Sequence, residues 1–439
     1  MLEIYIPEAY FSEMAFTIDV LLGDMAGLQY TLKGSQNLDY TELKCDAKCI
    51  RIKNCFFKEP LYHTSKVPTE CSRESLNFRN KSWQFTQMYG VPNIVDLDDV
   101  VEINSDFIAS SYFMLSRWEE MLEHKKDEYG RFDAEQALCV RKDFYHLPIV
   151  NEYSSILIEI LQTMGYAGQT KSTKAQLLLS HDIDITRKYK HWYNILKAGF
   201  EEGDLKVKEL WKHISNEEQI NTDPFFNFSK LSDIAISRGL KLTYYFAAVN
   251  ESKPQFDIFD YRVDDRNIKD AIRALIDQGH NIGLHPSYNS YKNEIMIMEE
   301  KARLEEVAGV EITRSRQHYL RYDVEKTPAY LQNAGIKQDS SMHYSIGPGF
   351  RTGACFEHSM YDIKQRKKLS IRQQPLIFMD THLVERPMEE ILENFSKVSS
   401  QVIKHGGVMT VLWHNNNVWP ASNLRKYITL VDHFQNQYN

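Results

Sequence analysis

The sequence is poor in cysteine, with only six in 439 residues. So few thiols exclude a small scaffold held together by disulfides, and we expect them to stay reduced. Three of them stand close together in CDAKCIRIKNC, residues 45–55, where the spacings are four and six residues. Because zinc sites usually take cysteines as CxxC pairs, this spacing favours ordinary buried thiols over a metal site.

Long apolar runs and an excess of positive charge are also missing. No stretch approaches the roughly 18 apolar residues of a spanning helix, and the amino terminus lacks a basic segment followed by an apolar core. We therefore expect no transmembrane segment and a cytoplasmic location. The net charge of −8 and the pI of about 6.0 give no general electrostatic reason to bind nucleic acid.

Apolar residues are plentiful, at 43% of the chain, and a chain of 439 residues favours two domains. The polar stretch GQTKSTKAQ, residues 168–176, is the expected linker. We predict a smaller mixed α/β domain of unknown role over residues 1–168 and a second domain over residues 175–439. In the second domain, apolar runs such as QLLLS and VMTVLWHN alternate with helical periodicity, which indicates a mainly parallel sheet or barrel.

Four of the apolar runs end in side chains that suit metal or acid–base chemistry. In parallel α/β folds such groups lie at the carboxyl ends of strands, where loops vary over a fixed core. The first run ends in SHDID, and strand alternation sends both of its aspartates the same way. Two carboxylates so close repel each other unless a cation or a shared proton relieves the repulsion, and a metal with one direct ligand and one neighbouring base is the simplest arrangement. The four ends carry Asp182 and Asp184, His285, His318, and His414.

The order of SHDID, GHNIGLHPSY, RSRQHYLR, GIKQDSSMHY and VLWHNN resembles the five-motif pattern of polysaccharide deacetylases, carbohydrate esterase family 4, also called the NodB-homology fold. The resemblance runs from Gln176 to the carboxy terminus. The segments are more closely similar to a branch of bacterial proteins in which such a domain follows an uncharacterised amino-terminal domain. The family resemblance implies a distorted (β/α) barrel. It also implies a metal-dependent N-deacetylase that binds a divalent cation, which we expect to be zinc.

The family's motifs carry roles over to particular residues. The first motif implies Asp182 as general base and Asp184 as metal ligand, and the last implies His414 as the acid that protonates the departing amine. By resemblance, Arg316 or Arg321 holds Asp182 ionised. The resemblance and the neighbouring motifs also place three residues at the substrate: Tyr319 near the oxyanion, Arg351 and Trp413. For Arg351 a structural salt bridge is an equal alternative.

The second motif departs from the family pattern. The family has His-x-x-x-His, both histidines binding the metal, whereas this chain has His285 followed by Asn289. An amide oxygen is a weak zinc ligand. Either Asn289 holds the metal loosely or another histidine replaces it, and His318 is our candidate. His181 is a weaker candidate, because strand alternation points it away.

The expected substrate is an N-acetylated sugar, a glycan, or a lipid- or nucleotide-linked glycan precursor. Two alternatives remain open: a catalytically impaired carbohydrate-binding or scaffolding protein, which Asn289 motivates, and a hydrolase of a non-sugar amide. The insertion after the first strand, residues 186–221, is longer than an ordinary βα loop. Its segment KYKHWY, residues 188–193, is either a basic-aromatic platform for a sugar phosphate or lipid-linked glycan, or a solvated helical face.

Overall fold

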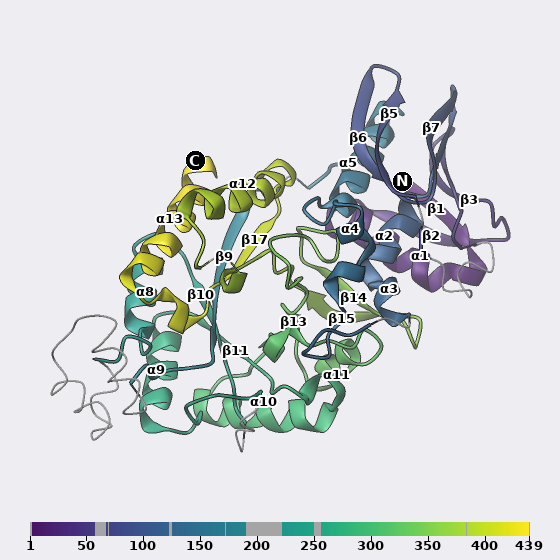
Figure 1. Ribbon diagram of the computed structural model, residues 1–439. Coiled ribbons are helices and arrows are strands. Elements are labelled where there is room, and N and C mark those ends of the chain that lie inside the picture. Colours follow the sequence, from purple (N-terminus) through teal and green to yellow (C-terminus); the bar gives the residue numbers. More distant parts are fainter. Residues whose placement is uncertain are drawn as a thin grey trace.

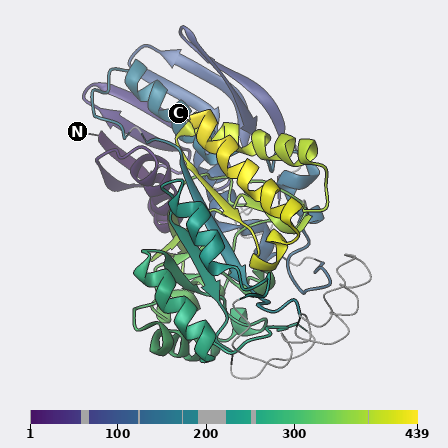
Figure 2. The same ribbon diagram turned by 90° about the vertical axis from the view of Figure 1, so that its left-hand side faces the viewer.

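The computed structural model describes residues 2–57, 67–68, 70–122, 125–171, 173–189, 222–249, 256–382 and 384–438. These residues form a mixed α/β structure with several sheets, as the sequence predicts. Figures 1 and 2 show the amino-terminal strands gathered at one end of the molecule and the later strands covered by helices at the other. No helix in the described part of the chain is long and apolar enough to cross a membrane.

The amino-terminal part is built on a six-stranded sheet and a two-stranded hairpin, which is more strand than its weak sequence pattern suggests. The sheet has the order β2-β1-β3-β4-β8-β7, and the hairpin pairs β5 with β6. The strands are β1 (Leu2–Pro7), β2 (Tyr30–Ser35), β3 (Tyr40–Cys45), β4 (Lys48–Lys53), β5 (Ser72–Phe78), β6 (Lys81–Gln87), β7 (Gly90–Leu97) and β8 (Val100–Ser105). In β1, Leu2, Ile4 and Ile6 are fully buried, which is the alternation of a strand with one core face.

Among the described residues, the amino-terminal part also contains five α-helices and a π-helical segment. They are α1 (Phe11–Ile18), η2 (Asp19–Asp24), α2 (Phe107–Ser116), α3 (Trp118–Met121), α4 (Leu138–Arg141) and α5 (Ile149–Thr163). The Asp106 side chain caps α2 by accepting a hydrogen bond from the Ala109 N–H at 2.9 Å. Helix α2 ends at Arg117, which has a φ of +57°.

The carboxy-terminal part is built on a nine-stranded sheet in the order β14-β15-β13-β12-β11-β10-β9-β17-β16. Neighbours are parallel except β14 and β15. Among the described residues no ladder joins β16 to β14, so the predicted barrel is shown only as a mainly parallel sheet. The strands are β9 (Gln176–Ile183), β10 (Leu242–Phe246), β11 (Asn281–Leu284), β12 (Arg314–Ser315), β13 (Gln338–Asp339), β14 (His358–Asp362), β15 (Lys367–Gln373), β16 (Phe378–Met379) and β17 (Val408–Leu412).

In the described part of the chain, six α-helices lie outside this sheet (Figure 1). They are α8 (Phe228–Ile236), α9 (Arg266–Asp277), α10 (Glu294–Ala308), α11 (Thr327–Asn333), α12 (Met388–His405) and α13 (Ala421–Tyr438). Helix α9 shows why: Ile268, Ile272 and Leu275 recur at helical spacing and are buried, while the rest of its sequence is largely polar. The apolar stripe of α9 thus faces β11 of the sheet.

Strand β9 positions the polar end that the sequence singles out. It runs parallel between β10 and β17. Its side chains alternate, so His181 points to the helix side, where its Nδ1 lies 2.6 Å from the Trp413 carbonyl and its ring lies against Tyr427 of α13. Asp182 therefore faces the opposite side, as expected.

The two parts of the chain share their interior. One hydrophobic core cluster takes in buried residues from Leu2 to Phe434. Arg117 at the end of α2 is buried and donates from Nη1 to the Arg351 carbonyl, 2.6 Å away, and from Nη2 to the Tyr344 hydroxyl, 2.7 Å away. The domain boundary at residues 168–175 stays a prediction.

Candidate active site

A cavity of about 530 Å³ opens at the carboxyl ends of the strands of the nine-stranded sheet. Residues directly after β9, β11 and β17 line it, together with the turn at His318 and the stretch from Asp127 to Arg131 of the amino-terminal part. The strand ends that the sequence predicts to carry the chemistry thus border a cavity. Residues of both the amino-terminal and the carboxy-terminal part line it.

Three residues on the floor of this cavity could hold a metal ion. Asp184, His285 and His318 offer ligand atoms that all lie within 4.8 Å of one another. Asp184 follows β9, His285 follows β11, and His318 opens the short helical turn η6 (His318–Leu320). The turn that follows β12 therefore brings in the third donor from a neighbouring strand end.

The outer nitrogen of each histidine is held by an oxygen atom. His285 Nδ1 lies 2.6 Å from the Arg316 carbonyl, and His318 Nδ1 lies 3.0 Å from Oδ1 of Asp257. A carbonyl cannot donate, so His285 carries its proton on Nδ1 and turns the Nε2 lone pair inward. Such outer hydrogen bonds orient metal-binding histidines. Asp257 was not foreseen, because it lies in an irregular segment far from any strand end.

The inward-facing atoms fit a cation. His285 Nε2 lies 3.3 Å from Oδ1 of Asp184, and this buried oxygen has no hydrogen-bond partner among the described residues. A lone pair facing a carboxylate oxygen is unfavourable unless a proton or a cation lies between them. Burial alone lowers the pKa of His285, but the charges of Asp182 and Asp184 raise it overall. One carboxylate and two imidazoles form a donor set typical of a divalent ion such as zinc.

Asp182 is paired with Arg316 at the same place. Its Oδ1 accepts from Arg316 Nη1 at 2.8 Å, and both side chains are buried, at 2% and 0% exposed. Ser340 fixes the guanidinium by accepting at its carbonyl and hydroxyl oxygens, each at 3.1 Å. The other carboxylate oxygen, Oδ2, lies 3.9 Å from His285 Nε2. Asp182 therefore presents one held and one available oxygen beside the three candidate ligands.

His414 also lies near Asp184 and is held by Asp380. Its Nδ1 lies 2.7 Å from Oδ1 of Asp380, its backbone N–H donates to Oδ2 of Asp380, and its Nε2 lies 3.8 Å from Oδ2 of Asp184. Burial by itself lowers the pKa of His414, but the charge and hydrogen bond of Asp380 outweigh it and raise the pKa to about 10. A cation bound beside Asp184 would oppose this rise. Asp380 could have been recognised from the sequence, because it directly follows the strand β16, as Asp184 directly follows β9.

The amino-terminal part builds one wall of the cavity. Arg131 donates from Nη1 to the Tyr319 carbonyl at 3.0 Å, and the rings of Tyr129 and Tyr319 stack with centroids 4.8 Å apart. The Tyr288 hydroxyl donates to the Tyr129 carbonyl at 2.8 Å. No local pattern in the sequence marks residues 127–131 as part of a site, because these contacts join distant stretches.

Two predicted residues lie beside the cavity instead of on its floor. Arg321 donates to the Tyr288 carbonyl at 2.6 Å and to Oδ1 of Asn289 at 3.2 Å. Its guanidinium also lies over the ring of Tyr291, 4.2 Å from the centroid. Of the two candidate arginines, then, Arg316 is the one that contacts Asp182. The oxygen of Asn289 is used by Arg321, and Asn289 is not among the described residues that line the cavity.

The other two predicted substrate contacts are buried away from it. Arg351 forms a two-pronged ion pair with Glu120, at 3.0 and 2.6 Å, and donates to the His343 carbonyl. It therefore takes the structural alternative, because Glu120 supplies its counter-charge. Trp413 is 0% exposed and its ring lies against Tyr427. Its backbone follows β17 to the site, but the indole points into the core.

The insertion after β9 is described only at its start. Lys188 lies with its Nζ 4.4 Å from the ring centroid of Trp419. The remaining residues of the proposed basic-aromatic platform, Lys190, His191, Trp192 and Tyr193, lie outside the described residues. The platform therefore stays a hypothesis.

A family model described as a family of unknown function (DUF7033) matches residues 2–166. No curated protein matches this chain. Similar solved structures include a Mycobacterium smegmatis protein described as a polysaccharide deacetylase (14% identity, 60% of this chain and 85% of that one, TM-score 0.38), the chitin deacetylase of Colletotrichum lindemuthianum (12%, 61% and 84%, 0.33) and a CE4 family pseudoenzyme of Bacillus anthracis (9%, 60% and 62%, 0.29). These structural neighbours are named as deacetylases or CE4 proteins, and likenesses this low say nothing of activity.

Proposed function

We propose that this protein is a metal-dependent hydrolase that removes N-acetyl groups from a sugar or glycan precursor. One observation carries the proposal: Asp184, His285 and His318 converge within 4.8 Å, and a carboxylate and an imidazole stand on either side of them. Asp182 Oδ2 is 3.9 Å from His285, and His414 Nε2 is 3.8 Å from Asp184. A possible proton acceptor and a possible proton donor thus flank one metal-binding position.

Asp184, His285 and His318 would hold a divalent cation, with zinc as the expected ion. When bound, such an ion polarises a carbonyl group and lowers the pKa of its bound water to about 7. A fourth position left open by three protein ligands suits a catalytic site.

The chain's own side chains would move the protons. Asp182, held by Arg316 through one oxygen, would accept a proton from the attacking water with the other. The water oxygen joins the acetyl carbon and the C–N bond breaks. His414, oriented by Asp380 through Nδ1, would donate a proton from Nε2 to the departing amine. Acetate and a free amine are the products.

The cavity walls suit a ring-shaped polar substrate. Tyr129 and Tyr319 supply aromatic surface, while Arg131, Asn416 and Asn417 supply polar groups. Small-molecule pockets commonly combine aromatic lining with a few polar groups that fix orientation. The sugar class itself rests on the order of the sequence motifs. We propose further that residues 1–168 form a domain that completes this wall, and residues 175–439 the domain that carries the chemistry.

Acetate release tests the proposal directly. Protein purified without chelators is assayed for metal content and against N-acetylated sugars that are free, nucleotide-linked or lipid-linked. We expect release by the wild type, loss on chelation, and loss in Asp182→Asn. The exposed Asp277 on α9 gives a matched control, Asp277→Asn, that keeps wild-type activity. Sugar binding without release at full metal content would favour the non-catalytic alternative, and release only from non-sugar amides would favour the other one.

A further inference from the structure

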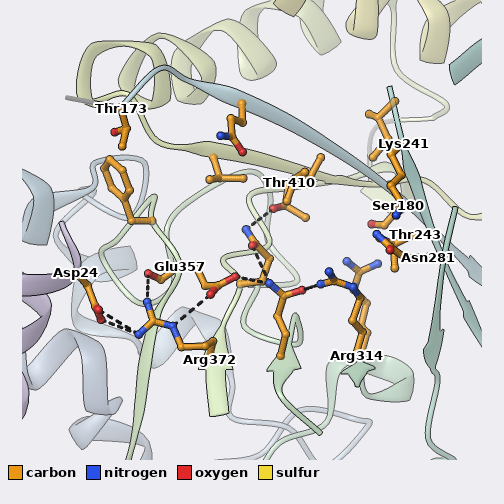
Figure 3. A pocket seen from close by; sticks show the side chains of 18 of the residues that line it. Asp24, Thr173, Ser180, Lys241, Thr243, Asn281, Arg314, Glu357, Arg372 and Thr410 are labelled. Carbon is orange, nitrogen blue, oxygen red and sulfur yellow. Dashed lines mark hydrogen bonds and ion pairs between the residues drawn. The ribbon is translucent and has the colours of Figure 1, made fainter. Parts of the chain in front are cut away.

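A second cavity, of about 400 Å³, lies at the amino ends of the same strands, the end of the sheet away from Asp184 (Figure 3). Gln176 begins β9, Asn281 begins β11 and Arg314 begins β12, and all three line it. Lys241 lines it from the residue just before β10. Of the residues placed in the candidate active site, Arg316 also lines this cavity, whereas the three candidate metal ligands do not.

The inner face of the sheet is polar around this cavity. Parallel sheets covered by helices usually carry near-continuous apolar runs, and the interiors of parallel barrels fill with branched apolar side chains. Here the lining includes Ser180, Thr243, Asn281, Gln374 and Thr410. Apolar side chains such as Leu178 and Val408 are also present, but hydroxyl and amide groups line much of the hollow at the amino ends of the strands.

Positive charge dominates the lining. Six cationic side chains face two carboxylates, Asp24 and Glu357. Arg372 engages both, at 3.0 Å and 3.2 Å. Arg316 is committed to Asp182, which leaves four cations that enter no ion pair among the described residues: Lys171, Lys174, Lys241 and Arg314. This surplus stands out in a chain with a net charge of −8.

Part of this charge is held in place. Arg314 donates to the side chain of Gln338, which in turn donates to Glu357. Glu357 accepts from Arg372, so one chain of hydrogen bonds crosses the cavity from β12 to β15 (Figure 3). Arg314 is therefore oriented before any ligand arrives, and Lys241 lies on the same side of the view, above Thr243 and Asn281 (Figure 3).

We propose that this cavity binds a small phosphorylated molecule about the size of a sugar phosphate. Several unpaired cations suit a ligand with a dianionic phosphate better than a ligand with a single carboxylate. Arg314 can offer its planar guanidinium to two phosphate oxygens, and each lysine offers a single positive charge. Thr243, Asn281 and Thr410 offer partners to the hydroxyl groups of such a ligand. A volume of about 400 Å³ lies within the range of small-molecule sites.

Calorimetric titration of the full chain tests this, with inorganic phosphate and a hexose phosphate as probes and acetate at equal ionic strength as the comparison. We expect one phosphate probe per chain, and roughly tenfold or greater weakening in Lys241→Gln and in Arg314→Gln, because each removes a charge-assisted hydrogen bond. Lys230→Gln, an exposed charge on α8 that does not line the cavity, is the matched control and keeps wild-type affinity.

The His285→Ala variant separates this cavity from the candidate metal site. Phosphate held at a metal ion is lost in that variant, whereas phosphate at the amino ends of the strands is retained. Equal affinity in wild type and Lys241→Gln, loss in His285→Ala alone, or acetate binding as tight as phosphate overturns the proposal. If Arg314→Gln fails to fold, the exposed Lys241 still gives a folded variant.

Discussion

Nη1 of Arg131 donates to the carbonyl oxygen of Tyr319 at 3.0 Å, across 188 residues of sequence. Tyr319 has a φ of +58°, a left-handed conformation that non-glycine residues rarely adopt. Its neighbour His318 is a candidate metal ligand. The amino-terminal part of the chain therefore steadies the turn that presents His318, and its own side chains face the same cavity.

This contact predicts a role for Arg131 in substrate binding. Arg131→Ala removes a polar group from the cavity wall and frees the Tyr319 carbonyl. We expect KM for the substrate to rise several-fold, with metal content close to that of the wild type. Arg141→Ala, an exposed arginine of the same part of the chain, is the control. Unchanged KM in Arg131→Ala would show that the wall does not touch the substrate.

The third metal ligand can be decided by two alanine variants. His318→Ala should lower metal affinity sharply, because it leaves only Asp184 and His285 as ligands. Asn289→Ala should barely change it, because the Asn289 oxygen accepts from Arg321. Metal titration followed by elemental analysis measures both. The reverse ranking would make Asn289 the ligand and leave His318 a supporting role.

Asp257 should tune metal affinity without binding the metal. It accepts from Nδ1 of His318 at 3.0 Å, and loss of such an outer partner typically costs roughly 10–100-fold in affinity. Asp257→Asn should therefore weaken metal binding by about that factor and leave the fold intact. Metal titration and circular dichroism are the measurements. Wild-type affinity in this variant would mean that His318 is oriented by other contacts.

Asp182→Asn separates rate from metal binding. An amide still accepts from Arg316 but is a far poorer base, so acetate release should fall roughly 10²–10⁴-fold while metal content persists. Asp182→Ala is a harsher change, because it leaves the buried Arg316 without its partner, at a cost of about 3–5 kcal/mol in stability. If Asp182→Asn releases acetate as fast as the wild type, the base is another group.

Glu120 predicts a pH dependence of stability. Burial alone raises the pKa of Glu120, but Arg351 and Arg117 outweigh it and lower the pKa from 4.5 to about 2. Because the folded pKa is depressed, the stabilisation is complete above pH 4.5 and disappears as the pH falls towards 2. A shift of this size corresponds to on the order of 3 kcal/mol.

Calorimetric Tm values of Glu120→Gln and the wild type across pH check this. The variant should melt at a clearly lower temperature at neutral pH, and the gap should narrow below pH 4.5. Glu135→Gln, at an exposed position in the same part of the chain, should follow the wild type throughout. A gap that stays constant with pH would mean that lost contacts, and not charge, explain the difference.

Strand alternation predicted much of the candidate site because it is a local property. A period of two places Asp182 on the inner face and His181 outside, and strand ends of a parallel sheet share one edge. The gathering of Asp184, His285 and His318 follows from that rule together with the turn at His318.

Partners that come from elsewhere in the chain could not be predicted. Asp257 reaches His318 from an irregular segment, and Tyr129 reaches Tyr319 from the amino-terminal part, so neither has a periodic signal. Arg351 looked like a substrate contact because its counter-charge, Glu120, lies 231 residues away. The edge strands of the six-stranded sheet, β2 and β7, also lack a clear sequence signal, since both are largely exposed and neither shows a regular buried alternation.

Residues 127–131 touch the cavity only at its wall and contribute none of the three candidate metal ligands. Substitutions there replace none of these ligands, and the contacts of this stretch near the metal position are those of Arg131 and Tyr129 with Tyr319. During evolution, substitutions in this short stretch could change which ligand the cavity accepts while the candidate metal ligands stay the same. The same separation makes it a convenient stretch to randomise when the aim is to change which ligand the cavity accepts.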